Sequence, residues 1–200
     1  MTVSANIPLA MQRTSRYVLD MIPSGVMTSD ELLHLKLPGK RTELLKGVLV
    51  VREPAGYLHG EVAAELANQL MNHVKADDLG RVLAAETGFK LTSDPDTVRA
   101  PDVAFITKER LPDPPPTGYA ELAPDLVVEV LSPDDRPGAV LAKVGDWLVA
   151  GSRLIWVVDP KRRLARVYRA DGSETILDED GVLDGEDVVP GFACPLEGIL

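Results

Sequence analysis

Residues 125–131, DLVVEVL, form an almost continuous apolar run that contains one acidic residue, Glu129. Runs of this kind are typical of strands that are covered on both faces of a sheet. Two further β-like segments precede it, at 82–91 and 98–106, and turn-rich stretches separate the three. We therefore expect three consecutive strands in the middle of the chain, with Glu129 inside the third.

Helical periodicity flanks this strand region on both sides. In residues 59–75 an apolar side chain recurs at every fourth position, which predicts an amphipathic helix with one face on a core. A second helical pattern covers 137–150, and 154–158 is a further apolar strand. Helix, three strands, helix and strand in this order predict an α/β sandwich with a mixed central sheet.

Shorter elements are expected outside this core. Thr28 and Glu31 have the spacing of a capping box, at the start of a helix of about two turns that we expect to end at Pro38-Gly39. Residues 42–52 are interpreted as an N-terminal hairpin, and residues 163–177 as a C-terminal hairpin. Both hairpins are additions to the predicted sandwich.

Length and composition limit the class of protein. Two hundred residues, 45% hydrophobic and 26% charged, fit one globular domain, which we place at 27–200 after an extension at 1–26. No apolar run approaches the ~20 residues that span a bilayer, and the N-terminus lacks the features of a signal peptide, so we expect a cytoplasmic protein. A single cysteine, Cys194, excludes an intrachain disulfide and a multi-cysteine zinc site.

The net charge of -10 counts against simple binding of nucleic acid, because Lys and Arg supply phosphate contacts. The charge does not exclude an enzyme that acts on nucleic acid, since a bound divalent cation reverses the local field at a carboxylate site.

Two acidic residues lie in the predicted strands at positions where burial of a carboxylate is energetically unfavourable. Asp102 leads the second strand after Pro101, and Glu129 interrupts the third. A buried carboxylate is costly unless it is paired or binds a metal. Taken singly, Asp102 is better interpreted as a turn residue at a strand end, and Glu129 is interpreted equally well as half of a buried ion pair. On consecutive strands, the pair favours a site for one hard cation, Mg²⁺ with Mn²⁺ as its substitute.

Four motifs follow one another along the chain: RAPDVAFI (99–106), APDLVVEVLSP (123–133), Lys143 with Trp147, and LIWVVDP (154–160). Their order and spacing resemble the Uma-two type restriction endonuclease family, which belongs to the PD-(D/E)XK nuclease superfamily. The resemblance covers roughly residues 27–200. It implies a restriction-endonuclease-like α/β/α sandwich and the hydrolysis of phosphodiester bonds in nucleic acid, DNA in particular, with Mg²⁺ as cofactor.

Carried over by position, the resemblance implies that Asp102 and Glu129 are the two metal-binding acids. The lysine that the superfamily places two residues after the second acid is absent, because residue 131 is leucine. Lys143, in the following predicted helix, is its counterpart in the resembling family, although without that context it would be interpreted as a surface lysine. Trp147, one helical turn further, is interpreted as a core residue and not as a base-stacking group.

Weaker candidates come from other parts of the chain. Glu43 and His59 match further positions of the family; Glu43 could complete the metal shell, and His59 could bind phosphate or relay a proton. The alternatives are an exposed strand residue and a helix residue that faces water. Glu86 is a further candidate for the metal shell. Five basic residues on the C-terminal hairpin could follow a phosphate backbone or form a solvated face: Lys161, Arg162, Arg163, Arg166 and Arg169.

We thus predict a Mg²⁺-dependent endonuclease that acts on DNA as a homodimer and does not associate with a membrane. Two alternatives belong to other classes of protein. One is a catalytically inactive nuclease fold that serves as a binding or regulatory module, which the acidity and the displaced lysine favour, since a fold alone does not determine function. The other is an assembly component whose exposed strands mediate oligomerisation.

Overall fold

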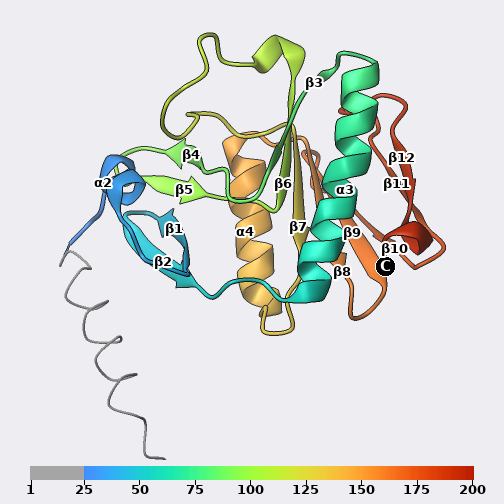
Figure 1. Ribbon diagram of the computed structural model, residues 1–200, viewed down its shortest axis with the longest axis horizontal. Coiled ribbons are helices and arrows are strands. Elements are labelled where there is room, and N and C mark those ends of the chain that lie inside the picture. The colour runs from blue at the N-terminus through green and yellow to red at the C-terminus, as the bar shows by residue number, and fades with distance from the viewer. Residues whose placement is uncertain (1–24) are drawn as a thin grey trace, which may run out of the picture.

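The computed structural model describes residues 25–200, so the extension expected at 1–26 lies almost wholly outside the described residues. A mixed sheet forms the middle layer (Figure 1), with strand order β10-β9-β8-β7-β6-β3. Its strands are β3 (Gly80–Ala84), β6 (Val103–Thr107), β7 (Leu126–Val130), β8 (Leu154–Asp159), β9 (Leu164–Arg169) and β10 (Glu174–Leu177). β7 and β8 are parallel, and the other neighbours are antiparallel.

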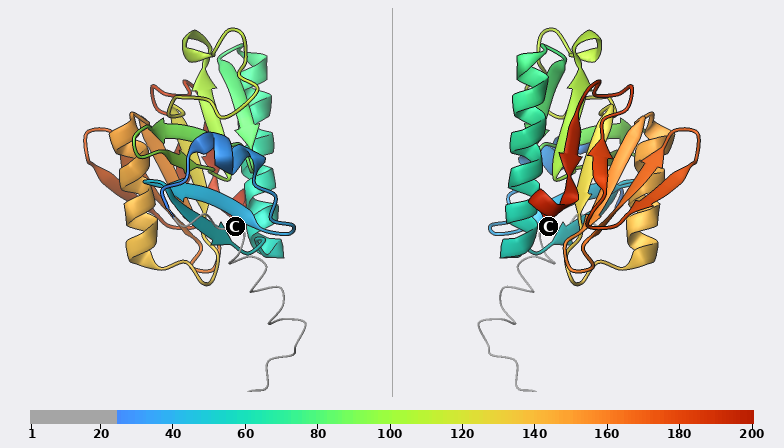
Figure 2. Two further views of the ribbon diagram at one scale, coloured as in Figure 1. Left: turned by 90° about the vertical axis from the view of Figure 1, so that its left-hand side faces the viewer. Right: turned by 90° about the vertical axis from the view of Figure 1, so that its right-hand side faces the viewer.

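Two helices cover opposite faces of this sheet, α3 (Tyr57–Ala76) and α4 (Pro137–Ala150), as Figures 1 and 2 show. Each face of the sheet has its own hydrophobic core, and successive residues of β7 point into one or the other. Val128 packs with the apolar face of α3, and Val127 packs with Val144 and Trp147 of α4. α4 also connects the parallel strands β7 and β8, as a crossover between parallel neighbours requires. The predicted α/β sandwich with a mixed sheet is confirmed.

A second sheet, with order β2-β1-β5-β4, lies beside the first. It contains β1 (Arg41–Leu45), β2 (Val48–Arg52), β4 (Phe89–Thr92) and β5 (Thr97–Arg99). The hairpin expected at 42–52 is therefore confirmed as β1 and β2.

The prediction of single strands at 82–91 and 98–106 is wrong, because each segment divides between the two sheets. Pro101 lacks the N–H that a continuous strand would use, so β5 ends before it and β6 begins after it. Between β3 and β4 the chain passes Gly88, where a Cβ would meet the ring of Tyr119 at 2.5 Å. Glycine therefore permits this close crossing.

The capping box at Thr28 and Glu31 is present, at the start of α2 (Ser29–His34). The helix ends earlier than expected, because Leu35 is already extended (φ -70°, ψ 124°), and Pro38-Gly39 lies in a separate turn. Leu32 of α2 packs on the second sheet with Leu44 and other apolar residues.

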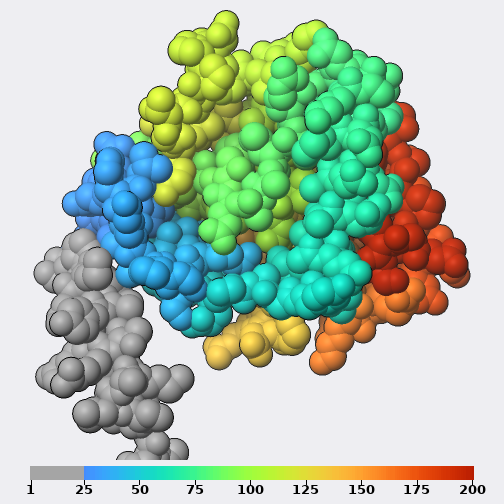
Figure 3. Space-filling model, in the orientation of Figure 1, coloured from blue at the N-terminus to red at the C-terminus, as the bar shows by residue number. Residues whose placement is uncertain are grey.

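The C-terminal segment forms a hairpin that the sequence pattern did not predict, β11 (Val182–Asp184) with β12 (Ala193–Pro195). Its apolar side chains join the core beneath α3, and Figure 3 shows the segment against that helix. The remaining elements are the short 3-10 helices η1 (Lys108–Arg110) and η2 (Leu196–Gly198). Within residues 25–200, no helix is long and apolar enough to cross a membrane.

Candidate functional site

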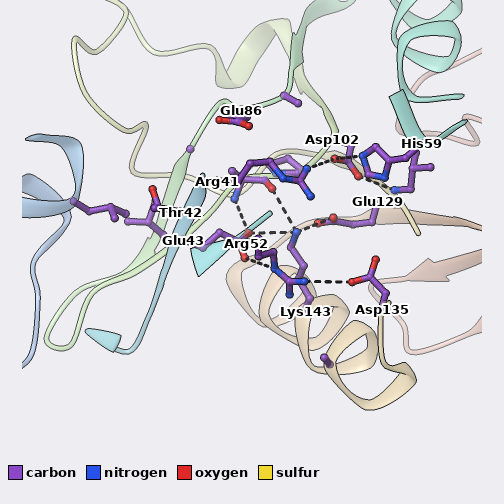
Figure 4. Close-up of a pocket in the computed structure, with 18 of the residues that line it drawn as sticks. Arg41, Thr42, Glu43, Arg52, His59, Glu86, Asp102, Glu129, Asp135 and Lys143 are labelled. Atoms are coloured by element: carbon purple, nitrogen blue, oxygen red, sulfur yellow. Dashed lines mark hydrogen bonds and ion pairs between the residues drawn. The ribbon is translucent and has the colours of Figure 1, made fainter. Parts of the chain in front are cut away.

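The two sheets meet around a cavity of about 230 Å³ close to the junction between β5 and β6. β1, the start of β6, β7 and the two long helices each contribute a polar side chain to its wall (Figure 4). These side chains are the five predicted site residues, which lie far apart in the sequence: Glu43, His59, Asp102, Glu129 and Lys143.

Asp102 lies immediately before β6 and is 6% exposed. Its backbone N–H donates to Val128 O at 3.1 Å, which extends the pairing of β6 with β7. Its Oδ2 accepts the N–H of Val130 at 2.8 Å, and its Oδ1 lies 3.0 Å from His59 Nε2. Burial opposes ionisation, but the hydrogen bonds from His59 and Val130 outweigh it and lower the pKa of Asp102. Asp102 thus lies in a bend before the strand, as the turn interpretation expects, but its carboxylate is buried and hydrogen-bonded.

Glu129 replaces an apolar residue on the face of β7 that packs against α4, and it is 7% exposed. Its Oε2 accepts from Lys143 Nζ at 2.8 Å, and its Oε1 accepts from Trp147 Nε1 at 2.9 Å. Burial raises the pKa of Glu129 to about 7. The positive charge of Lys143 opposes this rise, whereas the Asp102 and Glu43 carboxylates add to it. Glu129 is thus both half of a buried ion pair and a carboxylate that gains a proton readily.

Lys143 reaches from α4 to the strands. Its Nζ lies 2.8 Å from Glu129 Oε2 and 3.3 Å from Glu43 Oε1, and it also contacts Ala100 O at 3.4 Å. Burial disfavours its charge, but Glu129 and Glu43 outweigh burial and raise the pKa of Lys143. With 16% of its side chain exposed, Lys143 is not the solvated surface lysine of the alternative interpretation.

Glu43 and His59 are also buried, so their solvent-facing interpretations are wrong. Glu43 accepts from Arg99 Nη1 at 2.9 Å and from the N–H of Ala100 at 3.0 Å. Lys143 and Arg99 outweigh the opposing effect of burial and lower the pKa of Glu43. Because an ionised Asp102 can only accept, His59 Nε2 is the donor in their hydrogen bond.

A sequence model of the Uma2 family, described as "Putative restriction endonuclease", matches residues 29–197. The chain belongs to the Uma2 family.

The fold has a counterpart among solved structures: a crystal structure described as "a putative nuclease belonging to DUF820 from Anabaena variabilis ATCC 29413". The TM-score is 0.75 at 22% identity, and the match covers 86% of this chain and 97% of the other. At this identity the likeness shows the fold alone. No curated protein matches the chain. The family supports a nuclease function for this Uma2 protein.

Several polar contacts of the Uma2 site involve residues that sequence reasoning missed or assigned to packing alone. Arg99 connects Glu43 to Asp146 of α4, at 2.9 Å and 3.0 Å. Trp147 is fully buried, as predicted, and it also fixes the orientation of Glu129 through its indole N–H. The spacing of Lys143 and Trp147, one helical turn apart, could have indicated that both side chains reach the same carboxylate.

Two other expectations concern residues at the periphery. Glu86 lines the cavity but is exposed, and its side chain makes no hydrogen bond or ion pair within residues 25–200. The basic hairpin cluster is largely neutralised, which favours its interpretation as a solvated face. Its ion pairs are Arg162–Asp159, Arg163–Glu179, Arg166–Glu174 and Arg169–Glu186.

Replacing Trp147 by phenylalanine is expected to lower the free energy of unfolding by about 1–3 kcal/mol more than the same change at Trp156. Both indoles are fully buried, but only the N–H of Trp147 has a partner; that of Trp156 has none among the described residues. Trp147→Phe therefore leaves a Glu129 oxygen unsatisfied, whereas Trp156→Phe removes an unpaired donor. Denaturant unfolding of both variants measures the difference, and equal losses would show that the indole N–H of Trp147 does not stabilise the site.

Proposed function

We propose that this protein is a metal-dependent endonuclease that hydrolyses phosphodiester bonds of DNA. One observation carries the proposal: Asp102 and Glu129 line one cavity from adjacent positions in the sheet, and Lys143 contacts Glu129 there. Two buried acids, with a lysine of α4 beside them, suit the hydrolysis of a phosphodiester bond. The family to which the chain belongs supports the same reaction class.

The residues present fit a hard divalent cation of the Mg²⁺ type. Within residues 25–200, no group of three or more His, Cys, Asp or Glu side chains is placed to hold a metal ion. Mg²⁺ does not require such a cage, because it is commonly held by one or two carboxylates with waters and a substrate phosphate. Asp102 and Glu129 would be those ligands, with Mn²⁺ as a substitute. The raised pKa of Glu129 supports this assignment, since a nearby cation would compensate its buried charge.

A cation held there would lower the pKa of an attacking water and offset negative charge on the phosphate. The side chains of the protein have their own parts in the reaction. Lys143 is placed to donate a hydrogen bond to an oxygen on which negative charge develops. Glu43 and Glu129 hold the ammonium group in position, and His59 holds Asp102 by its hydrogen bond.

A second, larger cavity of about 650 Å³ supports the proposal that the substrate is a polymer. It shares His59 and Asp135 with the first cavity, so the two lie side by side. Exposed Tyr57, Leu58 and Leu141 contribute to its wall. The pair of cavities offers room for more of a nucleic acid chain than one phosphate group.

The test is a cleavage assay with purified protein on duplex DNA, single-stranded DNA and RNA, with Mg²⁺ or Mn²⁺ and with chelator as the control. We expect cleavage of DNA that chelator abolishes. Binding without cleavage of any substrate would instead favour the inactive binding or regulatory module, which the net charge of -10 and the displaced lysine also favour. The homodimer expected from the sequence stays a prediction.

Binding of Mn²⁺ is expected to strengthen about tenfold between pH 6 and pH 8. Glu129 has a pKa of about 7, so below pH 7 it is mostly protonated and the cation must displace a proton, whereas at pH 8 the carboxylate is already ionised. Calorimetry at the two pH values, in buffers of different ionisation enthalpy, measures both the affinity and the number of protons released. An affinity that is equal at both values, with no proton release at pH 6, would contradict the assignment of Glu129 as a ligand.

A further inference from the structure

Two arginines of the β1–β2 hairpin point toward the same cavity as the carboxylates (Figure 4). Arg41, the first residue of β1, pairs directly with Arg52, the last residue of β2. Like charges in direct cross-strand positions repel each other and destabilise a hairpin. Their placement therefore needs an explanation beyond the stability of the hairpin.

The arginines have hydrogen-bonding capacity that the protein leaves unused. Arg41 Nη1 lies 3.4 Å from Asp102 Oδ1, and Arg52 Nη1 lies 3.3 Å from Asp135 Oδ1. Arg52 Nε also lies 3.9 Å from Glu43 Oε2, which is beyond hydrogen-bonding distance. The Nε–H groups of both are buried and have no hydrogen-bond partner among the described residues. The side chains are 26% and 36% exposed, so a ligand that enters the cavity from solvent can reach them.

The other cationic groups on the cavity wall are already engaged. Lys143 is held by Glu129 and Glu43, and His59 donates to Asp102. Among the described residues that line this cavity, Arg41 and Arg52 are thus the cations that keep unpartnered N–H groups. A guanidinium group offers several N–H donors in a planar fork that matches the oxygens of a phosphate.

We propose that Arg41 and Arg52 together bind a phosphate group of the nucleic acid backbone in this cavity, beside the carboxylate pair. The inference rests on the proposed function and assigns the substrate-holding part of the same site to the N-terminal hairpin.

The experiment is a titration of a short fluorescent DNA duplex with protein in Ca²⁺, in place of Mg²⁺, at several salt concentrations. For Arg52→Gln and Arg41→Gln we expect about tenfold weaker binding, and a salt dependence whose log–log slope is smaller by about 1 for each arginine. Arg52→Lys keeps the charge but loses the fork, so we expect it to keep the salt slope and to lose part of the affinity. Arg153→Gln is the matched control, because Arg153 pairs with Asp187 at the surface and does not line the cavity; its binding should equal that of the wild type.

Thermal melting separates phosphate binding from a structural role. Relief of the repulsion between the arginines should leave Arg52→Gln at least as stable as the wild type. A lower melting temperature together with an unchanged salt slope would overturn the proposal, as would wild-type affinity in both glutamine variants. Inorganic phosphate is the competitor, and if it bound as tightly as the duplex, the site would serve free phosphate and the assignment to the backbone would be wrong.

The binding assay also keeps this inference distinguishable from the proposed function, because it requires no cleavage. Arginine-dependent binding by a protein that cuts no substrate would support the inference and contradict the endonuclease. Cleavage by wild-type protein, with binding that does not depend on either arginine, would do the reverse.

Discussion

Replacing Asp102 by asparagine is expected to reduce Mg²⁺-dependent DNA cleavage by a factor on the order of 10³ or more. Asparagine has the same size and retains an oxygen that can accept from Val130 or from His59, so the strand pairing and the cavity should persist. It lacks the negative charge that holds a divalent cation, so the reaction would lose its metal ligand while the fold remains. Single-turnover cleavage of a supercoiled plasmid measures the effect.

The control for this prediction is Asp187→Asn, the same chemical change at a side chain that is 81% exposed and lies in an ion pair with Arg153. It should cleave at the wild-type rate. Circular dichroism and melting curves of Asp102→Asn establish that its fold is intact. A variant that is folded and retains more than about a tenth of wild-type activity would remove Asp102 from the reaction and contradict the proposed site.

Replacing Lys143 by methionine is expected to affect both activity and stability. Cleavage should fall by about 10²–10³, because the hydrogen-bond donor for the developing charge is lost. The free energy of unfolding should fall by about 3–5 kcal/mol, since the buried carboxylates of Glu129 and Glu43 lose their shared cation. Methionine keeps the length and apolar volume of the side chain, so the loss reflects charge and not packing.

The loss of stability in Lys143→Met should depend on pH with a definite sign. The pKa of Glu129 is already raised to about 7, and removal of Lys143 raises it further because the attraction that lowers it disappears. A group whose pKa is higher in the folded than in the unfolded protein makes folding less favourable as the pH rises through the folded value. The variant should therefore lose more stability at pH 8 than at pH 6.

Denaturant unfolding at both pH values tests this prediction, with Lys108→Met as the matched control. Lys108 is 57% exposed and pairs with Asp78 at the surface, so its replacement should cost less than about 1 kcal/mol at either pH. Mn²⁺ should stabilise Lys143→Met more than it stabilises the wild type, since the cation replaces the missing charge. A loss in Lys143→Met no larger than the control's would mean that Lys143 is not needed to balance the buried acids.

The contrast between Glu129 and Arg99 shows how far the candidate site could be predicted. Glu129 is conspicuous in the sequence, because an acid within an apolar strand is costly and requires a partner. Arg99 belongs to one of the quoted motifs, but its partners Glu43 and Asp146 lie 56 and 47 residues away, and no local pattern indicates them. The same holds for Arg41 and Arg52, whose contacts are to Asp102 and Asp135.

The sandwich and its two long helices could be predicted from the sequence, and the family resemblance marks the acids and the lysine that line the cavity. These features depend on periodicity and motif order, which are local properties of a chain. The folded protein alone shows that the segments at 82–91 and 98–106 divide between two sheets, and that the arginines of the β1–β2 hairpin line the same cavity as the carboxylates. Packing between distant segments selects the partners of strands and of buried charges, so no local pattern reveals them. DLVVEVL thus places Glu129 in a buried strand, and the packing of α4 and the second sheet around that strand decides which charges surround it.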